Sequence, residues 1–123
     1  MSKMLVENDF GRAELYELAQ GIQAVRFVHQ TGQGSVSLYG GQVLSWKPQG
    51  HKPVFWLSKN SQYCAGKAIR GGVPICWPWF GGEVKLASGK TEKASNHGFA
   101  RQSQWQLVDI KLSAAGVEII LSL

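Results

Sequence analysis

A cationic side chain next to a glycine pair is the first candidate for chemistry in this sequence. Arg70 precedes Gly71 and Gly72, and Val73 and Pro74 follow. The glycines can adopt backbone conformations closed to other residues and permit close approach of a ligand, and the proline stiffens the chain after them. A guanidinium suits phosphate or carboxylate oxygens. Arg70 is therefore a candidate anion clamp, and a surface arginine paired with an acidic side chain is the alternative.

The sequence NHGFAR holds a second dense group of polar residues. Asn96, His97 and Arg101 place an amide, an imidazole and a guanidinium around one glycine. These groups could converge on a single hydroxylated and charged ligand. An unperturbed histidine has a pKa of about 6.5, which suits proton transfer near neutral pH. The alternative for His97 is a partly buried histidine whose hydrogen bonds serve the structure alone.

Aromatic residues lie between these two groups. Trp77, Trp79 and Phe80 stand around Pro78 and are followed by two glycines. Sugar rings expose apolar C–H faces that pack on aromatic rings, and aromatic walls are common in small-molecule sites. The alternative is that these large side chains are part of the hydrophobic core.

The remaining histidines and cysteines predict no metal site. His29 and His51 are too far from His97 in sequence to form a ligand set, and both are expected to be solvated. Cys64 and Cys76 form no CxxC pair, so we expect reduced thiols with a packing role. The sequence also lacks the common phosphate-loop, dinucleotide, serine-hydrolase and zinc-protease motifs. A cofactor-free activity or simple binding is predicted.

The elements that must position these residues are mostly strands. Helix-forming residues with apolar side chains at Leu15, Leu18 and Ala19 predict one short N-terminal helix over 12–20. Alternating or β-branched segments predict strands over 22–29, 35–39, 42–47, 54–57, 105–112 and 117–123. Residues 58–104 have no sustained periodicity. The candidate site residues are thus expected on loops carried by an all-β scaffold.

Composition and charge limit the classes of partner that this chain is expected to bind. A chain of 123 residues that is 44% hydrophobic is one globular domain or part of one. Ten of its Lys and Arg residues lie within 21–101, against only Glu83 and Glu92, and they occur singly. This pattern favours a small anion over a nucleic acid. With no apolar run of about 18 residues and no secretory signal, we expect a cytoplasmic protein that does not contact a membrane.

The last segment indicates that the domain is incomplete. Val117, Ile119, Leu121 and Leu123 alternate along one apolar face, and the sequence ends inside this pattern. An uncovered apolar strand invites aggregation. We therefore expect 1–123 to be a single partial domain, the N-terminal portion of a larger fold. Without the missing C-terminal portion, such a chain is expected to self-associate.

The motifs together resemble a known family. The segment KAIRGGVPICWPWFGG (67–82), then NHGFAR and a tryptophan, preceded by GGQVLSW and VFWLSKN, resembles the glucose-6-phosphate 1-epimerase (hexose-6-phosphate mutarotase) family of the aldose 1-epimerase superfamily. The resemblance covers about residues 22–123. It implies a galactose mutarotase-like antiparallel β-sandwich, of which this chain is the N-terminal part, and an isomerase that needs no cofactor.

The resemblance also implies roles for individual residues. Arg70 and Arg101 match positions that hold the phosphate of a hexose 6-phosphate, and Asn96 matches a substrate-contacting position. His97 matches a histidine that helps to bind and polarise the sugar. The histidine acting as acid and the glutamate acting as base are expected beyond Leu123, so this chain alone is expected to be inactive or nearly so.

Three functions remain open from the sequence. The first is interconversion of the anomers of glucose 6-phosphate or a related hexose 6-phosphate, with this chain supplying the phosphate-binding part. The second is a carbohydrate- or anion-binding β-sandwich module without catalysis. The third, nucleic-acid binding, rests on the basic middle segment alone and predicts a steep loss of affinity with salt.

Overall fold

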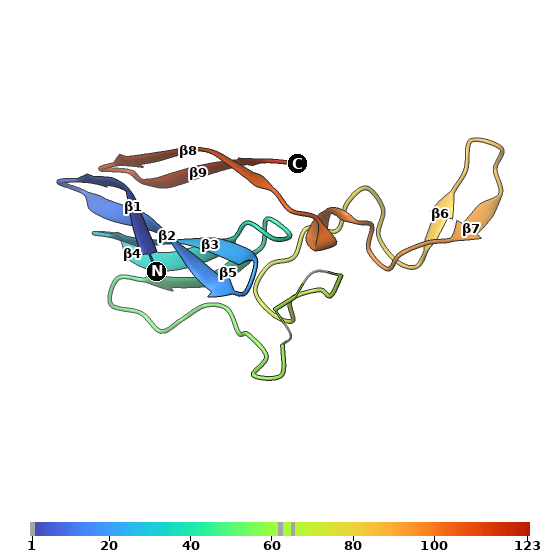
Figure 1. The fold of residues 1–123 in the computed structure, drawn as a ribbon, viewed down its shortest axis with the longest axis horizontal. Helices are drawn as coiled ribbons and strands as arrows, with labels where there is room; N and C mark the ends of the chain where they lie inside the picture. The colour runs from blue at the N-terminus through green and yellow to red at the C-terminus, as the bar shows by residue number, and fades with distance from the viewer. Residues whose placement is uncertain (1, 62, 65) are drawn as a thin grey trace.

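The computed structural model describes residues 2–61, 63–64 and 66–123. Its strands are antiparallel, and in the described part the one helical element is a single 3₁₀ turn (Figure 1). The elements are β1 (Ser2–Asn8), β2 (Gly11–Ala19), β3 (Ile22–His29), β4 (Gly32–Ser37), β5 (Val43–Pro48), β6 (Glu83–Lys85), β7 (Thr91–Lys93), η1 (Ala100–Gln102), β8 (Gln106–Ser113) and β9 (Gly116–Ser122). The predicted all-β class is confirmed.

Strands β1 to β5 form one sheet in sequence order, each strand pairing with the next. The β8–β9 hairpin lies over one face of this sheet, where β8 contacts β1 and β2, and β9 contacts β3 (Figure 1). Ile119 and Leu121, from the alternating face predicted at the end of the chain, pack against this sheet. Two layers thus enclose an apolar cluster around Ala13, Val25 and Leu38. The complete sandwich that the resemblance implies remains a prediction.

The predicted short N-terminal helix over 12–20 is wrong, because this segment is strand β2. Its residues also suit a strand: Ala13 and Leu15 contact the cluster under the hairpin, whereas Tyr16 and Leu18 contact a second cluster. A bulge between Glu17 and Ala19 shifts the register against β3. Pairing with β1 and β3 on both sides outweighs the helix propensity of the segment.

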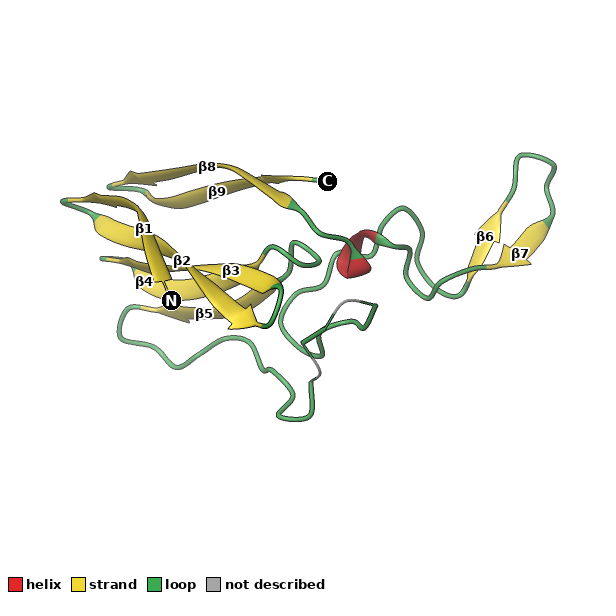
Figure 2. Cartoon of the chain, in the orientation of Figure 1, coloured by secondary structure: helices red, strands yellow, loops and turns green. Residues whose placement is uncertain are grey.

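Other boundaries also differ from the sequence prediction. The segment 54–57 is not a regular strand, and only Leu57 pairs there, in an isolated bridge to Gly71. Strand β1 and the β6–β7 hairpin were not predicted. In Figure 2 the chain between β5 and β6 is one long loop, and β6–β7 projects away from the main sheet. Within the described residues, no helix has the length and apolar character to span a membrane.

A second core cluster connects the sheet to the long loop. Ile22, Ala24, Tyr39 and Leu44 come from the sheet and its turns, and they pack with Ile69, which directly precedes Arg70. Ile69 is 4% exposed, although neighbouring loop residues are mostly open to solvent. The start of the Arg70 turn is therefore anchored in the core.

Histidine 29 fastens the hairpin to the sheet, contrary to the expectation that it is solvated. It is 4% exposed, and its Nε2 donates a hydrogen bond of 2.7 Å to the carbonyl of Ser113, the last residue of β8. Its Nδ1 accepts a bond of 3.0 Å from the Thr31 amide. Both ring nitrogens are thus engaged, and the two layers are joined at this end.

Candidate functional site

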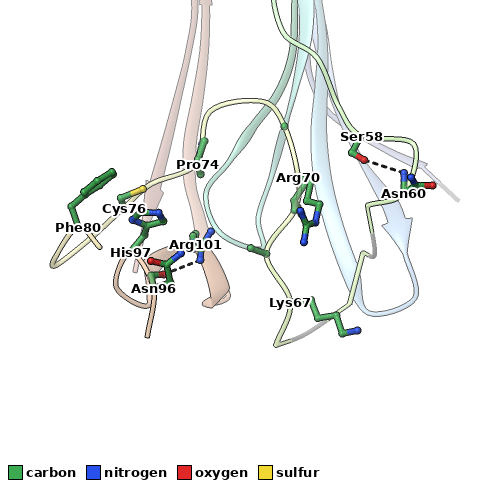
Figure 3. Close-up of a pocket in the computed structure, with 13 residues that line it drawn as sticks. Ser58, Asn60, Lys67, Arg70, Pro74, Cys76, Phe80, Asn96, His97 and Arg101 are labelled. Atoms are coloured by element: carbon green, nitrogen blue, oxygen red, sulfur yellow. Dashed lines mark hydrogen bonds between the residues drawn. The ribbon is translucent and has the colours of Figure 1, made fainter. Parts of the chain in front are cut away.

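One hollow of about 1150 Å³ collects all four predicted site residues. Arg70 lines it from the glycine turn, and Asn96, His97 and Arg101 line it from the segment that precedes and enters η1. Figure 3 shows these three side chains grouped on one side, with Arg70 and Lys67 on a different segment to their right. Two segments about thirty residues apart in sequence therefore line one concave surface. The roles of the four residues remain predictions.

The Arg70 turn is held by backbone contacts on both sides. The Arg70 amide donates to the Ser61 hydroxyl at 3.0 Å, and its carbonyl accepts from the Ser58 amide at 2.9 Å. Gly71 and Gly72 have φ values of +110° and +63°. A Cβ on Gly71 would overlap the Trp56 carbonyl, and a Cβ on Gly72 would overlap the carbonyl of Val43. The glycines are thus required by close backbone packing as well as by their φ values.

A buried amide that the sequence analysis missed supports the same turn. Gln42 is completely buried, and its Nε2 donates to the carbonyls of Ile69 at 3.2 Å and Gly71 at 2.5 Å. These carbonyls lie on either side of Arg70. The only signal in the sequence was the position of Gln42 inside the motif GGQVLSW, which gives no partner for the side chain.

Tyrosine 39 anchors the chain just before this turn. Its hydroxyl donates to the Lys67 carbonyl at 2.9 Å, and the residue is 3% exposed. Burial raises the pKa of the Tyr39 phenol above its ordinary value, because the phenolate would lose its hydration. Tyr39 and Gln42 flank a glycine pair, so the turn after β4 contacts the site loop through both residues.

Arg101 is fixed by the segment that carries it. One of its terminal nitrogens donates to the Asn96 carbonyl at 2.8 Å. Its Nε is buried and has no hydrogen-bond partner among the described residues. The backbone carbonyl of Arg101 lies so close to Gly40 that a Cβ there would meet it. The guanidinium is therefore held in place with one donor unsatisfied, which favours an acceptor-rich ligand.

His97 has the backbone and hydrogen bonds of a constrained residue. Its φ is +63°, a conformation that is uncommon for residues other than glycine. Its amide donates to the Gly81 carbonyl at 2.8 Å, and its Nδ1 accepts from the Gly81 amide at 3.0 Å. Because an amide can only donate, the proton of the neutral ring must lie on Nε2. His97 is thus arranged to donate a hydrogen bond through Nε2.

The predicted aromatic wall is divided between two places. Phe80 lines the hollow, is 77% exposed and packs on the His97 ring at a centroid distance of 4.3 Å. Trp77, which is 53% exposed, and Trp79 instead contact Phe99 edge to face. Neither Trp77 nor Phe80 is therefore a core residue. Stacking of a ligand remains a prediction for Phe80 alone.

The two motif segments, which already meet at Gly81 and His97, also approach closely at Gly98. Gly98 is buried with φ of +73°, and a Cβ there would overlap the Trp77 carbonyl. That carbonyl also accepts hydrogen bonds from the amides of Phe99 and Ala100, at 3.0 and 3.1 Å. The position of His97 and Arg101 thus depends on direct contact between the two backbones.

The hollow is electropositive. Its described lining contains the basic residues Lys67, Arg70 and Arg101 and no Asp or Glu. Neither arginine forms an ion pair within the described part of the chain, so the paired-surface alternative for Arg70 finds no support there. Cys76 lies in the lining, whereas Cys64 is exposed, which makes its predicted packing role wrong. Among described residues no cluster of His, Cys, Asp and Glu could hold a metal ion.

Comparison with known proteins agrees with this geometry. The family model described as aldose 1-epimerase matches residues 23–123, most of the chain. The chain belongs to the aldose 1-epimerase family. A protein of Escherichia coli named "Putative glucose-6-phosphate 1-epimerase" is 42% identical over 95 residues, which cover 77% of this chain and 30% of that protein. A Salmonella typhimurium protein of the same name is 46% identical over 79 residues, covering 64% of this chain and 25% of that protein.

The fold comparison gives the same family. A crystal structure from Salmonella typhimurium, described as a "putative mutarotase", has a TM-score of 0.78 and 32% identity to this chain, covering 98% of this chain and 38% of that one. The chain thus spans less than half the length of these relatives. The family match begins within β3 of the main sheet and runs through the β8–β9 hairpin, so it includes residues of both layers.

Proposed function

We propose that this chain supplies the phosphate-binding part of a cofactor-independent epimerase that interconverts the α and β anomers of glucose 6-phosphate or a related hexose 6-phosphate. The observation that carries the proposal is the placement of Arg70 and Arg101 on one electropositive hollow. Charge-assisted hydrogen bonds from guanidinium groups to phosphate oxygens are among the stronger polar contacts in proteins. The names of the relatives supply the substrate class.

The sugar end of the ligand would meet the other lining residues. His97 offers an Nε2 proton, which can donate to a ring or hydroxyl oxygen and polarise it. Asn96 directly precedes His97 and contributes an amide, and the exposed Phe80 ring beside His97 offers an apolar surface. This division places charge recognition at the arginines and sugar recognition at the imidazole.

Anomer exchange needs two proton transfers. A base removes the proton of the anomeric hydroxyl, an acid protonates the ring oxygen, and the C1–O5 bond breaks to give the open-chain aldehyde. Rotation about C1–C2 followed by reclosure with the reverse transfers gives the other anomer. The described lining offers no carboxylate for the base. We therefore assign the base and the acid to a segment outside these 123 residues, and each typically contributes about 10²–10⁴-fold to the rate.

Exchange spectroscopy on glucose 6-phosphate tests this function. NMR cross-peaks between the two anomeric protons are recorded with this chain alone, and with this chain fused to the remaining part of the Escherichia coli relative. We expect ligand-induced shifts but no added exchange with the chain alone, and rapid exchange with the fusion.

Two results would contradict the proposal in different ways. Rapid exchange by the 123-residue chain would refute the assignment of the base and acid to another segment. Binding without exchange in either form would favour the second candidate, a carbohydrate- or anion-binding module, which the lack of a carboxylate in the described lining also fits.

A further inference from the structure

Gln42 makes a pair of side-chain hydrogen bonds that neither the motif GGQVLSW nor the proposed function explains. It stands in the turn between β4 and β5, outside the lining of the hollow, and no part of its side chain is exposed. Its Nε2 bonds to the carbonyls of Ile69 and Gly71, at 3.2 and 2.5 Å. Its Oε1 is buried and has no hydrogen-bond partner among the described residues.

We propose that Gln42 is a positioning residue that sets the direction of the Arg70 side chain by clamping the two carbonyls on either side of it. This inference rests on the proposed function, because it assigns Gln42 to phosphate recognition through Arg70. Gln42 itself does not touch the hollow, so its effect on a ligand must be indirect.

The chemistry of the amide explains why this residue suits the task. A primary amide carries two N–H donors on one nitrogen, so it can bond to two carbonyls that lie close together. A carboxylate of the same shape offers no donor when ionised and would repel both oxygens. An apolar side chain of the same length would remove the donor from the buried bond to the Ile69 carbonyl and from the partly buried bond to the Gly71 carbonyl, which is costly. The clamp therefore requires both N–H groups of Nε2, one for each carbonyl.

The unpartnered Oε1 supports the same assignment. Buried polar atoms without partners are rare in folded proteins because they lose their hydration without replacement. Because Oε1 is nevertheless buried, we infer that the two hydrogen bonds from Nε2 stabilise the fold by more than the lost hydration of Oε1 costs. The opposite orientation of the amide would place Oε1 against two carbonyl oxygens and lose both bonds.

The clamp adds to the two backbone bonds of Arg70 at a residue whose side chain is otherwise free within the described part of the chain. The Arg70 side chain is exposed and makes no described ion pair, so its own contacts do not fix it. The Ile69 carbonyl belongs to the peptide plane that precedes Arg70, and the Gly71 carbonyl belongs to the plane after Gly71. The plane between them contains the Arg70 carbonyl, which accepts from the Ser58 amide, so Gln42 holds both ends of the short segment that sets the direction of the Arg70 Cα–Cβ bond. A side chain that starts in the correct direction loses less entropy on binding, which raises affinity.

The test compares Gln42→Met, which keeps the length of the side chain, with Gln33→Met, an exposed glutamine on β4. Isothermal titration measures the affinities for glucose 6-phosphate and for glucose. We expect Gln42→Met to weaken glucose 6-phosphate binding about tenfold, glucose binding less than about twofold, and Gln33→Met to change neither. Equal weakening of both ligands would overturn the proposal in favour of a general structural role.

A double-mutant cycle with Arg70→Ala separates positioning from stability. If Gln42 acts through Arg70, Gln42→Met should cause no further loss of glucose 6-phosphate affinity in the Arg70→Ala background. The same tenfold loss in both backgrounds would show that Gln42 acts independently of Arg70 and would overturn the proposal. Thermal melts of each variant identify any that fail to fold.

A measurement without ligand keeps the inference testable if the sugar-phosphate assignment fails. The Arg70 Nε–H resonance and the exchange rate of the Ser58 amide, which bonds to the Arg70 carbonyl, report the turn directly. Gln42→Met should shift the resonance and speed the exchange, whereas Gln33→Met should do neither. Unchanged values in a folded Gln42→Met protein would refute the clamp, and absence of glucose 6-phosphate binding by the unmodified chain would refute only the proposed function.

Discussion

The sheet and the site loops of this molecule are stabilised in different ways. Strands β1 to β5 repeat one kind of contact, backbone pairing over most of each strand, and the β8–β9 hairpin covers them with apolar side chains. The described residues between 49 and 105 contain only two three-residue strands and one 3₁₀ turn. They are fixed by single contacts from Tyr39, Gln42 and glycine backbones. One substitution can therefore abolish the site while leaving the sheet intact.

Gly98→Ala is expected to give the largest loss of ligand binding without a loss of sheet stability. The added Cβ would overlap the Trp77 carbonyl at a φ of +73°, so the segment of His97 and Arg101 must move. We expect the affinity for glucose 6-phosphate to fall about 100-fold or more, while amides of β2 and β3 keep their protection from hydrogen exchange. Both quantities can be measured on one labelled sample.

Gly89→Ala is the matched control for that change. Gly89 has a similar φ of +87°, but a Cβ there meets nothing within 4 Å. Gly89→Ala therefore measures the energetic cost of placing an alanine in the left-handed backbone conformation without any steric overlap. If Gly89→Ala weakened ligand binding as much as Gly98→Ala, the local contact with Trp77 would not be what holds the site.

His29→Ala is expected to have the opposite effect, a loss of sheet stability without a loss of ligand binding. This change removes the bond to the Ser113 carbonyl, which joins the hairpin to the sheet, and the bond from the Thr31 amide within the sheet. It also empties the space of a side chain that is only 4% exposed. We expect the free energy of unfolding to fall by about 2 kcal/mol in urea denaturation, with ligand affinity unchanged. His51→Ala, at an exposed loop position, should have no effect. A comparable loss of unfolding free energy for His51→Ala would argue against a specific role of the His29–Ser113 hydrogen bond.

A smaller effect is expected from Tyr39→Phe, at the contact between the two regions. Loss of the bond to the Lys67 carbonyl should lower the free energy of unfolding by about 1 kcal/mol at pH 7. Burial raises the pKa of Tyr39, so the stability that the neutral phenol provides is present below about pH 10 and lost as pH rises through the folded pKa.

The pH dependence supplies the check on that prediction. Unfolding free energies measured between pH 7 and pH 11 should fall more steeply for the unmodified protein than for Tyr39→Phe. Parallel profiles would mean that the Tyr39 phenol does not contribute to alkaline destabilisation.

The same contrast explains what could be predicted from the sequence. Strands rich in β-branched residues, such as β3, or with clear alternation, such as β9, were predicted close to their true bounds. Strand β2 was mistaken for a helix because Leu15, Leu18 and Ala19 fit a helical spacing, whereas its state depends on two neighbouring strands that no local pattern shows.

The candidate site shows a similar limit. Arg70, His97 and Arg101 were found because their residue types and the surrounding glycines already indicate chemistry. Gln42 and Tyr39 were missed, because the hydrogen bonds that define them join residues more than 25 positions apart. His29 was expected in solvent for the same reason, since its partner is Ser113.

The central claim is that Arg70 and Arg101 bind one phosphate in a shared hollow. The most direct test measures the affinities of Arg70→Ala and Arg101→Ala for glucose 6-phosphate and for glucose, with Arg26→Ala as a control outside the hollow. The account predicts that each hollow variant loses about 10–100-fold for the phosphorylated sugar and little for glucose, while Arg26→Ala loses neither. Equal losses for the two sugars would contradict it.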